Sequence, residues 1–162
     1  MKKANYVAKA AIIAAIYVVL TEISTLLGLS SGVIQIRFSE AMTVLPFFTP
    51  AAIPGLFVGC IISNLLAGGA LLDIVFGSVA TLLGALGTYA FRRYSMYLAP
   101  LFPIASNTLI IPWVLKLVYG FEGTVLFFTA TVFAGEVISC ACLGIPLMIL
   151  LGKRKGLLDI IR

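Results

Sequence analysis

The sequence predicts an all-α integral membrane protein, a bundle of six transmembrane helices. Of its 162 residues, 62% are hydrophobic and only 10% are charged, whereas about a quarter of the residues in a soluble domain are charged. The hydrophobic residues form six segments that turn-forming residues separate. The basic residues gather near the ends of these segments, as the positive-inside rule describes for membrane proteins.

The first three segments are identified by length, because a membrane-spanning helix needs about 20 mostly apolar residues. Segment 5–29 is longer than the 7–15-residue core of a typical signal peptide, so we expect it to remain as a helix. Segment 39–49 is short, and prolines at residues 46, 50 and 54 interrupt the chain where it passes into segment 51–68. Proline kinks or ends a helix, so we expect these two segments to form a bent pair.

The last three segments span 71–91, 97–119 and 122–151, with glycine-rich or charged turns between them. The sequence contains no long linker, low-complexity tract or internal repeat. We therefore predict a single transmembrane substrate-binding domain, 1–162.

The distribution of basic residues predicts the orientation. In the six-segment arrangement, nine of the 11 Lys and Arg residues fall on one side, and only Arg37 and Lys116 fall on the other. Because basic residues favour the cytoplasmic side, both termini are expected in the cytoplasm. The basic residues do not cluster on one polar face, so no nucleic-acid binding is expected. The nine residues are Lys2, Lys3, Lys9, Arg92, Arg93, Lys153, Arg154, Lys155 and Arg162.

A few polar residues lie within or beside the apolar segments and are candidates for binding a ligand. An uncompensated charge at the bilayer centre costs about 2.5–3.5 kcal/mol, so such side chains must face the protein interior, a partner group or a ligand. At about 1.5 Å per helical residue, they fall towards the outer side. This distribution predicts a pocket that opens outwards. The candidate residues are Arg37, Glu40, Asn64, Asp73, Asn107, Trp113 and Glu136.

Each candidate also has a purely structural explanation. Glu40 and Asp73 stand at expected helix starts, where a carboxylate can cap exposed N–H groups, and Arg37 can pair with Glu40. The two asparagines and Glu136 can form interhelical hydrogen bonds. Trp113 can anchor its helix at the membrane interface, or it can join Tyr119 in stacking on a flat ring.

The sequence predicts no catalytic group, metal site or cofactor. Histidine is absent, and Cys60, Cys140 and Cys142 lie in apolar segments without a Cys-x-x-Cys pair. No ATP-binding glycine loop is present. If ATP drives transport, another subunit must hydrolyse it.

Small residues form a stripe along the first segment. Such residues let another helix approach closely within lipid. The stripe can therefore pack inside the protein or dock a partner. Its members are Ala4, Ala8, Ala11 and Ala15, widened by Ala10 and Ala14.

Three sequence motifs resemble the QueT family of membrane proteins. They are QIRFSEAMTVLPFFTPAAIPGL at 35–56, GCIISN at 59–64 and DIVFGSVATL at 73–82. The resemblance covers essentially the whole chain, and Arg-Phe-Ser-Glu-Ala is its most specific part. The family is regarded as substrate-binding S-components of energy-coupling factor (ECF) transporters for queuosine precursors.

The resemblance implies a six-helix S-component in a bacterial plasma membrane, working with a membrane T-component and two ATPase subunits. It also implies docking onto the T-component through Ala10 and Ala14, or through Ala11 and Ala15. The loaded S-component would tip in the membrane to release its cargo inwards.

The implied cargo, a 7-deazaguanine, fits the chemistry of the candidate residues. It presents two adjacent N–H donors that one carboxylate can accept as a pair. Any of the three acids can do this, while an asparagine contacts the ring carbonyl and Trp113 stacks on the ring. A precursor with an aminomethyl cation would favour a second carboxylate. The alternatives are an S-component for another vitamin or nucleobase, and a stand-alone channel or proton-coupled carrier.

Overall fold

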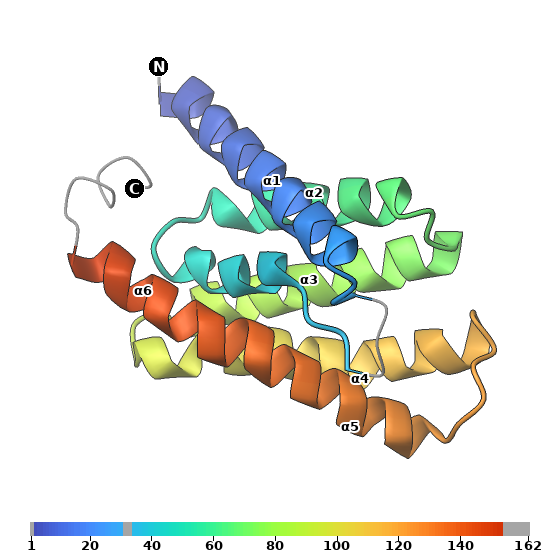
Figure 1. Ribbon diagram of the computed structural model, residues 1–162. Helices are drawn as coiled ribbons and strands as arrows, with labels where there is room; N and C mark the ends of the chain where they lie inside the picture. The colour runs from blue at the N-terminus through green and yellow to red at the C-terminus, as the bar shows by residue number, and fades with distance from the viewer. Residues whose placement is uncertain (1, 31–33, 154–162) are drawn as a thin grey trace.

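The computed structural model describes residues 2–30 and 34–153. The predicted basic residues Arg154, Lys155 and Arg162 lie outside this part of the chain. The described residues form an all-helical bundle (Figure 1), which confirms the predicted fold class. In chain order, its elements are α1 (Lys2–Leu26), η1 (Phe38–Phe47), α2 (Ala52–Leu66), α3 (Leu71–Phe91), η2 (Met96–Leu98), α4 (Leu101–Leu117), α5 (Val125–Glu136), η3 (Val137–Leu143) and α6 (Gly144–Lys153).

Six stretches of chain run alternately along the bundle, in the order that the sequence predicts. The last stretch is continuous, because α5, the π-helical η3 and α6 follow one another without a turn (Figure 1). Four stretches are long and apolar enough to cross a membrane, which makes the chain a multi-pass membrane protein. They are Lys3–Leu26, Leu71–Phe91, Met96–Leu117 and Val125–Lys153.

The second stretch is short, as predicted, and the third is shorter than the expected segment 51–68. η1 is a 3-10 helix of 10 residues that contains Pro46, and α2 has 15 residues. Proline cannot donate a backbone hydrogen bond within a helix, so the chain turns at Pro50 and the two helices form a bent pair. η1 places Glu40 within the bundle, where this residue is buried.

Both chain ends of the bundle lie on one side. α1 begins, and α3 and α6 end, at the left in Figure 1, whereas the α2–α3 and α4–α5 turns lie at the right. The basic residues of those helix ends therefore share one end of the molecule, opposite the two turns. Lys3, Arg92 and Lys153 belong to this basic end.

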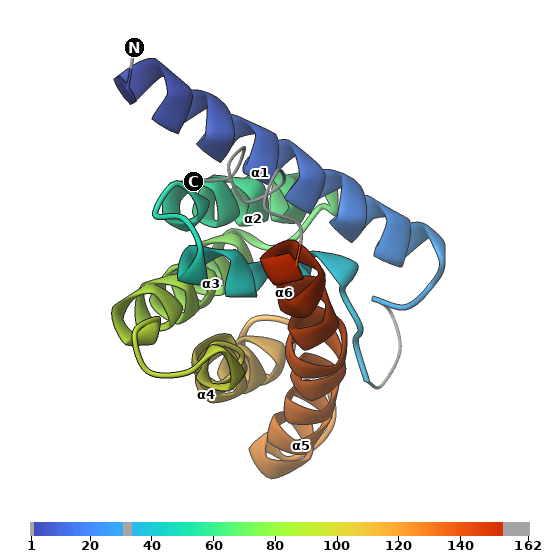
Figure 2. The same cartoon turned by 90° about the vertical axis from the view of Figure 1, so that its left-hand side faces the viewer.

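α1 packs closely against α2 through small residues. A Cβ atom on Gly55 would lie 2.7 Å from the Ala10 carbonyl oxygen, and one on Gly59 would lie 3.1 Å from the Ala14 carbonyl oxygen. Ala10 and Ala14 thus face α2, and Figure 2 shows α1 lying across it. The alanines that stay exposed on α1 are Ala4, Ala8, Ala11 and Ala15.

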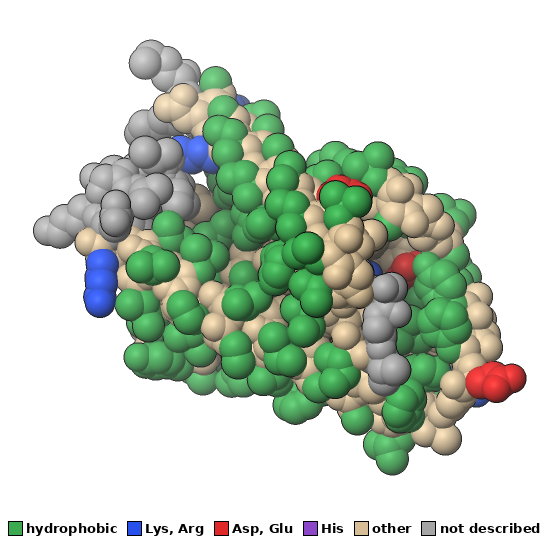
Figure 3. Space-filling model, in the orientation of Figure 1, with side chains coloured by type: hydrophobic (Ala, Val, Ile, Leu, Met, Phe, Trp, Pro, Cys, Tyr) green, Lys and Arg blue, Asp and Glu red, His purple; other side chains and the backbone are tan. Residues whose placement is uncertain are grey.

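The outer surface is apolar, as expected for a surface in contact with lipid. Hydrophobic side chains cover most of the described surface that is visible in Figure 3. Leu109 and Leu126, for example, are 71% and 78% exposed. Polar side chains instead turn inwards, and they surround the cavity described next.

Candidate substrate-binding site

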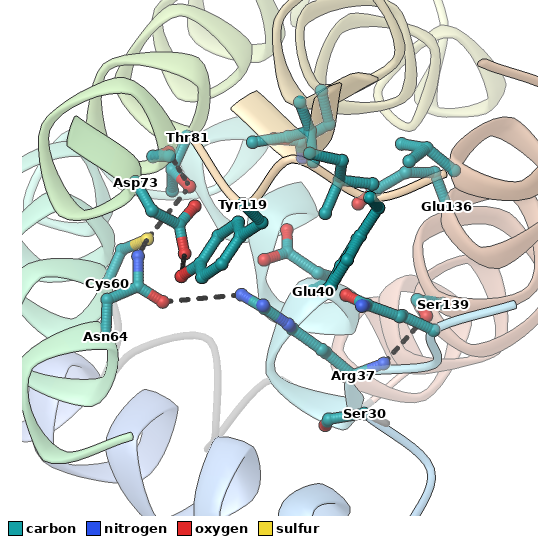
Figure 4. A pocket seen from close by; sticks show the side chains of 17 residues that line it. Ser30, Arg37, Glu40, Cys60, Asn64, Asp73, Thr81, Tyr119, Glu136 and Ser139 are labelled. Carbon is teal, nitrogen blue, oxygen red and sulfur yellow. Dashed lines mark hydrogen bonds between the residues drawn. The ribbon is translucent and has the colours of Figure 1, made fainter. Parts of the chain in front are cut away.

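A polar cavity of about 170 Å³ lies among η1, α2, α3, α4 and the α5–η3 helix (Figure 4). The α4–α5 turn also contributes to its walls, so the cavity lies towards the end of the bundle opposite the basic helix ends. Six of the seven candidate residues line it, although they come from five different parts of the chain. They are Arg37, Glu40, Asn64, Asp73, Asn107 and Glu136.

Glu40 is held by α1. Its side chain is 4% exposed, and Oε1 accepts a hydrogen bond of 2.5 Å from the hydroxyl of Tyr17. The other oxygen, Oε2, is buried and has no hydrogen-bond partner among the described residues. Glu40 stands in the first turn of η1, as the helix-start reading predicts, but among the described residues neither of its oxygens bonds to a backbone N–H.

A polar face of α1 fixes the start of η1. Thr21 and Ser24 follow Tyr17 at spacings of four and three, which place all three on one face of the helix. The Thr21 hydroxyl bonds to the Ser39 hydroxyl at 2.8 Å, and the Ser24 hydroxyl accepts the Phe38 N–H at 2.8 Å. The Tyr17 contact is a site feature that our sequence reasoning missed. The spacing of polar residues in an otherwise apolar segment was the available signal.

Arg37 bridges two walls of the cavity. Its backbone N–H donates to Ser139 Oγ at 3.2 Å, and its guanidinium Nη1 donates to Asn64 Oδ1 at 3.4 Å. In the described part of the chain, the guanidinium hydrogen-bonds to an amide, and it forms no ion pair with Glu40, the partner considered from the sequence. Beside Ser139, Gly135 lets the chain pass, because a Cβ there would collide with the carbonyl oxygen of Gln35. The sequence analysis identified neither Gly135 nor Ser139.

Asp73 lines the cavity, and its side chain accepts a hydrogen bond from the α4–α5 turn. The Tyr119 hydroxyl donates to Asp73 Oδ2 at 2.7 Å and accepts the Ala70 N–H at 3.2 Å. Burial, together with this hydrogen bond to Asp73, raises the pKa of Tyr119. The Tyr119 ring stacks on Phe121, with centroids 5.6 Å apart and ring planes 18° apart. Both rings line the cavity and offer it a flat apolar face.

Residues of α2 and α3 pack closely around the side chain of Asn64. Its amide Nδ2 lies 3.5 Å from Cys60 Sγ, to which the Thr81 hydroxyl also donates at 3.4 Å. A Cβ on Gly77 would lie 3.1 Å from the same amide nitrogen, so a glycine at this position avoids a close contact with the Asn64 amide. The side chain of Asn64 is thereby held with its oxygen towards Arg37.

Glu136 stands where α5 passes into the π-helical turn η3, a distortion that often marks functional sites. Its Oε2 accepts a hydrogen bond from Cys140 Sγ at 3.1 Å, and the side chain of Asn107 interacts with it as well. One atom each from Glu40, Glu136 and Cys140 lie within 4.8 Å of one another, a spacing that could hold a metal ion. Glu40 and Glu136 thus meet at one part of the cavity.

Trp113 does not line this cavity. It is 55% exposed and lies in a wholly apolar groove of about 420 Å³ between α3 and α4, with neighbours such as Phe76 and Leu109. The turn that follows α4 carries Tyr119 and Phe121 back over the cavity, whereas Trp113 stays on the outer face of the helix. The stacking face expected from Trp113 is therefore available from Tyr119 and Phe121.

The fold and the cavity define a class: a multi-pass helical membrane protein with a small internal polar cavity. Comparison with known proteins gives the family. The model of the QueT transporter family matches residues 7–153, and the chain belongs to this family. A relative from Lactococcus lactis subsp. cremoris (strain MG1363), described as "Queuosine precursor transporter QueT", is 39% identical over 85 residues. That match spans 52% of this chain and 50% of the relative. No solved structure gave a significant match.

Proposed function

We propose that this protein is the substrate-binding S-component of an ECF-type importer for a queuosine precursor, a 7-deazaguanine. The observation that carries the proposal is the cavity, in which carboxylates, amides and an aromatic pair converge within an otherwise apolar bundle. Membership of the QueT transporter family and the name of the L. lactis relative support this choice of cargo.

The size and lining of the cavity suit a single heterocycle. A volume of about 170 Å³ is below the roughly 300–1,000 Å³ of sites for drug-sized ligands. Asp73 can accept the paired N–H donors of a guanine-like edge, and Asn64 beside it can contact the ring carbonyl. Tyr119 and Phe121 can cover the face of the ring.

The proposed orientation places the cavity towards the outside. The basic ends of α1, α3 and α6 lie opposite the two turns that flank the cavity (Figure 1). Because Lys and Arg favour the cytoplasmic side, this arrangement supports cytoplasmic termini in a bacterial plasma membrane. The substrate would then enter from the exterior.

Transport in this proposal depends on a T-component and two ATPase subunits, since the sequence contains no ATP-binding glycine loop. Ala11 and Ala15 are the better candidates for the docking face, because they are exposed on α1. Ala14 is only 7% exposed and, with Ala10, faces the glycines of α2. The docking alternative that uses Ala10 and Ala14 would require α1 to leave α2.

Ligand titration of the purified chain by calorimetry and native mass spectrometry tests the cargo. We expect 7-deazaguanines to bind, and Asp73→Asn to weaken binding at least tenfold, because a charge-assisted hydrogen bond contributes about 1.5–3 kcal/mol and about 1.4 kcal/mol is tenfold. Glu122→Gln is the matched control, since Glu122 is an exposed acid outside the cavity lining. Failure of the wild type to bind would refute the cargo.

Uptake into vesicles tests the partners. Vesicles with the T-component and both ATPase subunits should accumulate the substrate only when ATP is supplied. Uptake by vesicles that contain this chain alone would refute the proposed mechanism and support a stand-alone carrier.

A further inference from the structure

We propose that the apolar groove between α3 and α4 binds one anionic phospholipid, whose acyl chain lies in the groove and whose phosphate is bound by Lys116. The groove and the polar cavity share no lining residue, so the inference does not depend on the cargo. It is argued from the lining of the groove, from its length and position, and from the charge at one end of it.

The groove lies on a surface that faces lipid. Its volume is about 420 Å³, and every side chain that lines it is hydrophobic. α3 and α4 belong to two of the stretches that are long and apolar enough to cross a membrane. Leu109, Trp113 and Leu117 are 71%, 55% and 75% exposed. In a membrane, the molecules next to these side chains are lipids.

The length and position of the groove match one leaflet of a bilayer. It extends from Leu72 to Val79 along α3 and from Leu109 to Val118 along α4, which is about 10–14 Å at 1.5 Å per residue. One leaflet contributes about half of a hydrocarbon core of roughly 30 Å. α3 begins and α4 ends at the turns on the right in Figure 1. The groove therefore runs from that membrane surface towards the bilayer centre, as an acyl chain does.

The lining favours a flexible chain over another helix. Helices that associate within lipid approach each other through small residues, whereas this groove is lined by large ones such as Phe76, Leu109 and Trp113. An unfilled hollow loses van der Waals contacts along its lining. A lipid chain can adapt its conformation to fill the hollow without leaving the bilayer.

Lys116 supplies a charge at the surface end of the groove. It lies three residues after Trp113, so the two side chains are neighbours on the surface of α4. Its Nζ donates to the carbonyl oxygen of Gly123 at 2.8 Å, and no acid among the described residues forms an ion pair with it. An ammonium group has three N–H donors, so two remain for the oxygens of a phosphate above the groove.

The fluorescence of Trp113 tests the inference, because this residue lies in the groove and is the single tryptophan of the chain. The purified full chain is placed in phosphatidylcholine bilayers in which a rising fraction of the lipid is brominated, since bromine quenches an indole that it contacts. Brominated phosphatidylglycerol, which is anionic, is compared with brominated phosphatidylcholine, which has no net charge. We expect about fivefold preference for phosphatidylglycerol, because a lysine near an anionic membrane surface contributes about 1 kcal/mol.

Two pairs of variants locate the contact. Lys116→Gln should reduce the preference to less than twofold, whereas Lys153→Gln, which removes an exposed lysine at the opposite end of the bundle, should leave it unchanged. Val79→Phe should fill the groove and raise the fraction of brominated phosphatidylglycerol needed for half-maximal quenching at least threefold. Val75→Phe is its matched control, since Val75 is 47% exposed one turn away on α3 but does not line the groove.

Equal quenching by the two lipids, or a preference that Lys116→Gln leaves unchanged, would overturn the inference and show contact with bulk lipid only. Fluorescence that neither lipid quenches, from a protein that is dimeric in the bilayer, would show that a second copy covers the groove and would also overturn it. If Val79→Phe does not fold, Lys116→Gln still decides the question, because it changes an exposed side chain.

Discussion

Tryptophan substitutions on the exposed face of α1 separate docking from binding. Ala11 and Ala15 are exposed and lie one turn apart, so they present a smooth surface on which another helix can approach closely. An indole at either position would hold the two helices apart. Overpacking a close contact costs about 1–3 kcal/mol, which corresponds to about 5- to 150-fold weaker association.

The assay pairs two measurements on Ala11→Trp and Ala15→Trp. Uptake by vesicles that contain the complete transporter should fall by the factor above. Ligand affinity of the isolated chain should stay within about twofold, because neither residue lines the cavity.

Two further variants serve as controls on the same helix. Ile16→Trp changes a side chain that is already large and 46% exposed, so uptake should be nearly unaffected. Ala14→Trp should instead destabilise the isolated chain, since the backbone of Ala14 packs against Gly59. The docking assignment is refuted if Ala11→Trp and Ala15→Trp transport normally, or if they lose ligand binding as well as uptake.

Three other substitutions probe the cavity and its support. Gly77→Ala should weaken ligand binding about tenfold in calorimetry, because the new Cβ would lie 3.1 Å from the Asn64 amide nitrogen; unchanged affinity would show that this amide is not positioned for the ligand. Trp113→Ala should leave affinity within about twofold, since Trp113 faces the apolar groove, and a larger loss would place it at the site. Tyr17→Phe should lower the free energy of unfolding by about 1–3 kcal/mol in thermal or denaturant melts, because both carboxylate oxygens of Glu40 would then lack a partner among the described residues. An unchanged melting curve would contradict that account.

The number and order of the helices were predictable from the sequence, because a helix that crosses lipid must be apolar and long enough to span it. Apolar length marks the helices and proline density marks the bent pair, so both follow from local composition. Polar residues such as Asn107, far from any expected helix end, were good candidates for the cavity because lipid leaves them few other places. Six of the seven candidates line it for this reason.

Composition does not determine how each helix is rotated about its own axis. The sequence therefore could not show which side chains face the cavity and which face away from it. Trp113 and Tyr119 are six residues apart, yet the former faces the apolar groove and the latter folds back over Asp73. The distinction between Ala11 and Ala14 likewise depends on which side of α1 meets α2. Gly135 has a role only because a distant loop passes over it, and nothing in its local sequence indicates that contact.

α1 connects the two surfaces on which the proposed transport depends. On one side, Tyr17 supplies the only hydrogen bond that Glu40 Oε1 receives among the described residues. On another side, Ala11 and Ala15 are exposed where a partner could bind. A displacement of α1 by a partner would therefore act directly on a carboxylate of the cavity, with no intervening chain of contacts. In the proposed transporter, the position of α1 and the binding of a ligand beside Glu40 would therefore be physically linked.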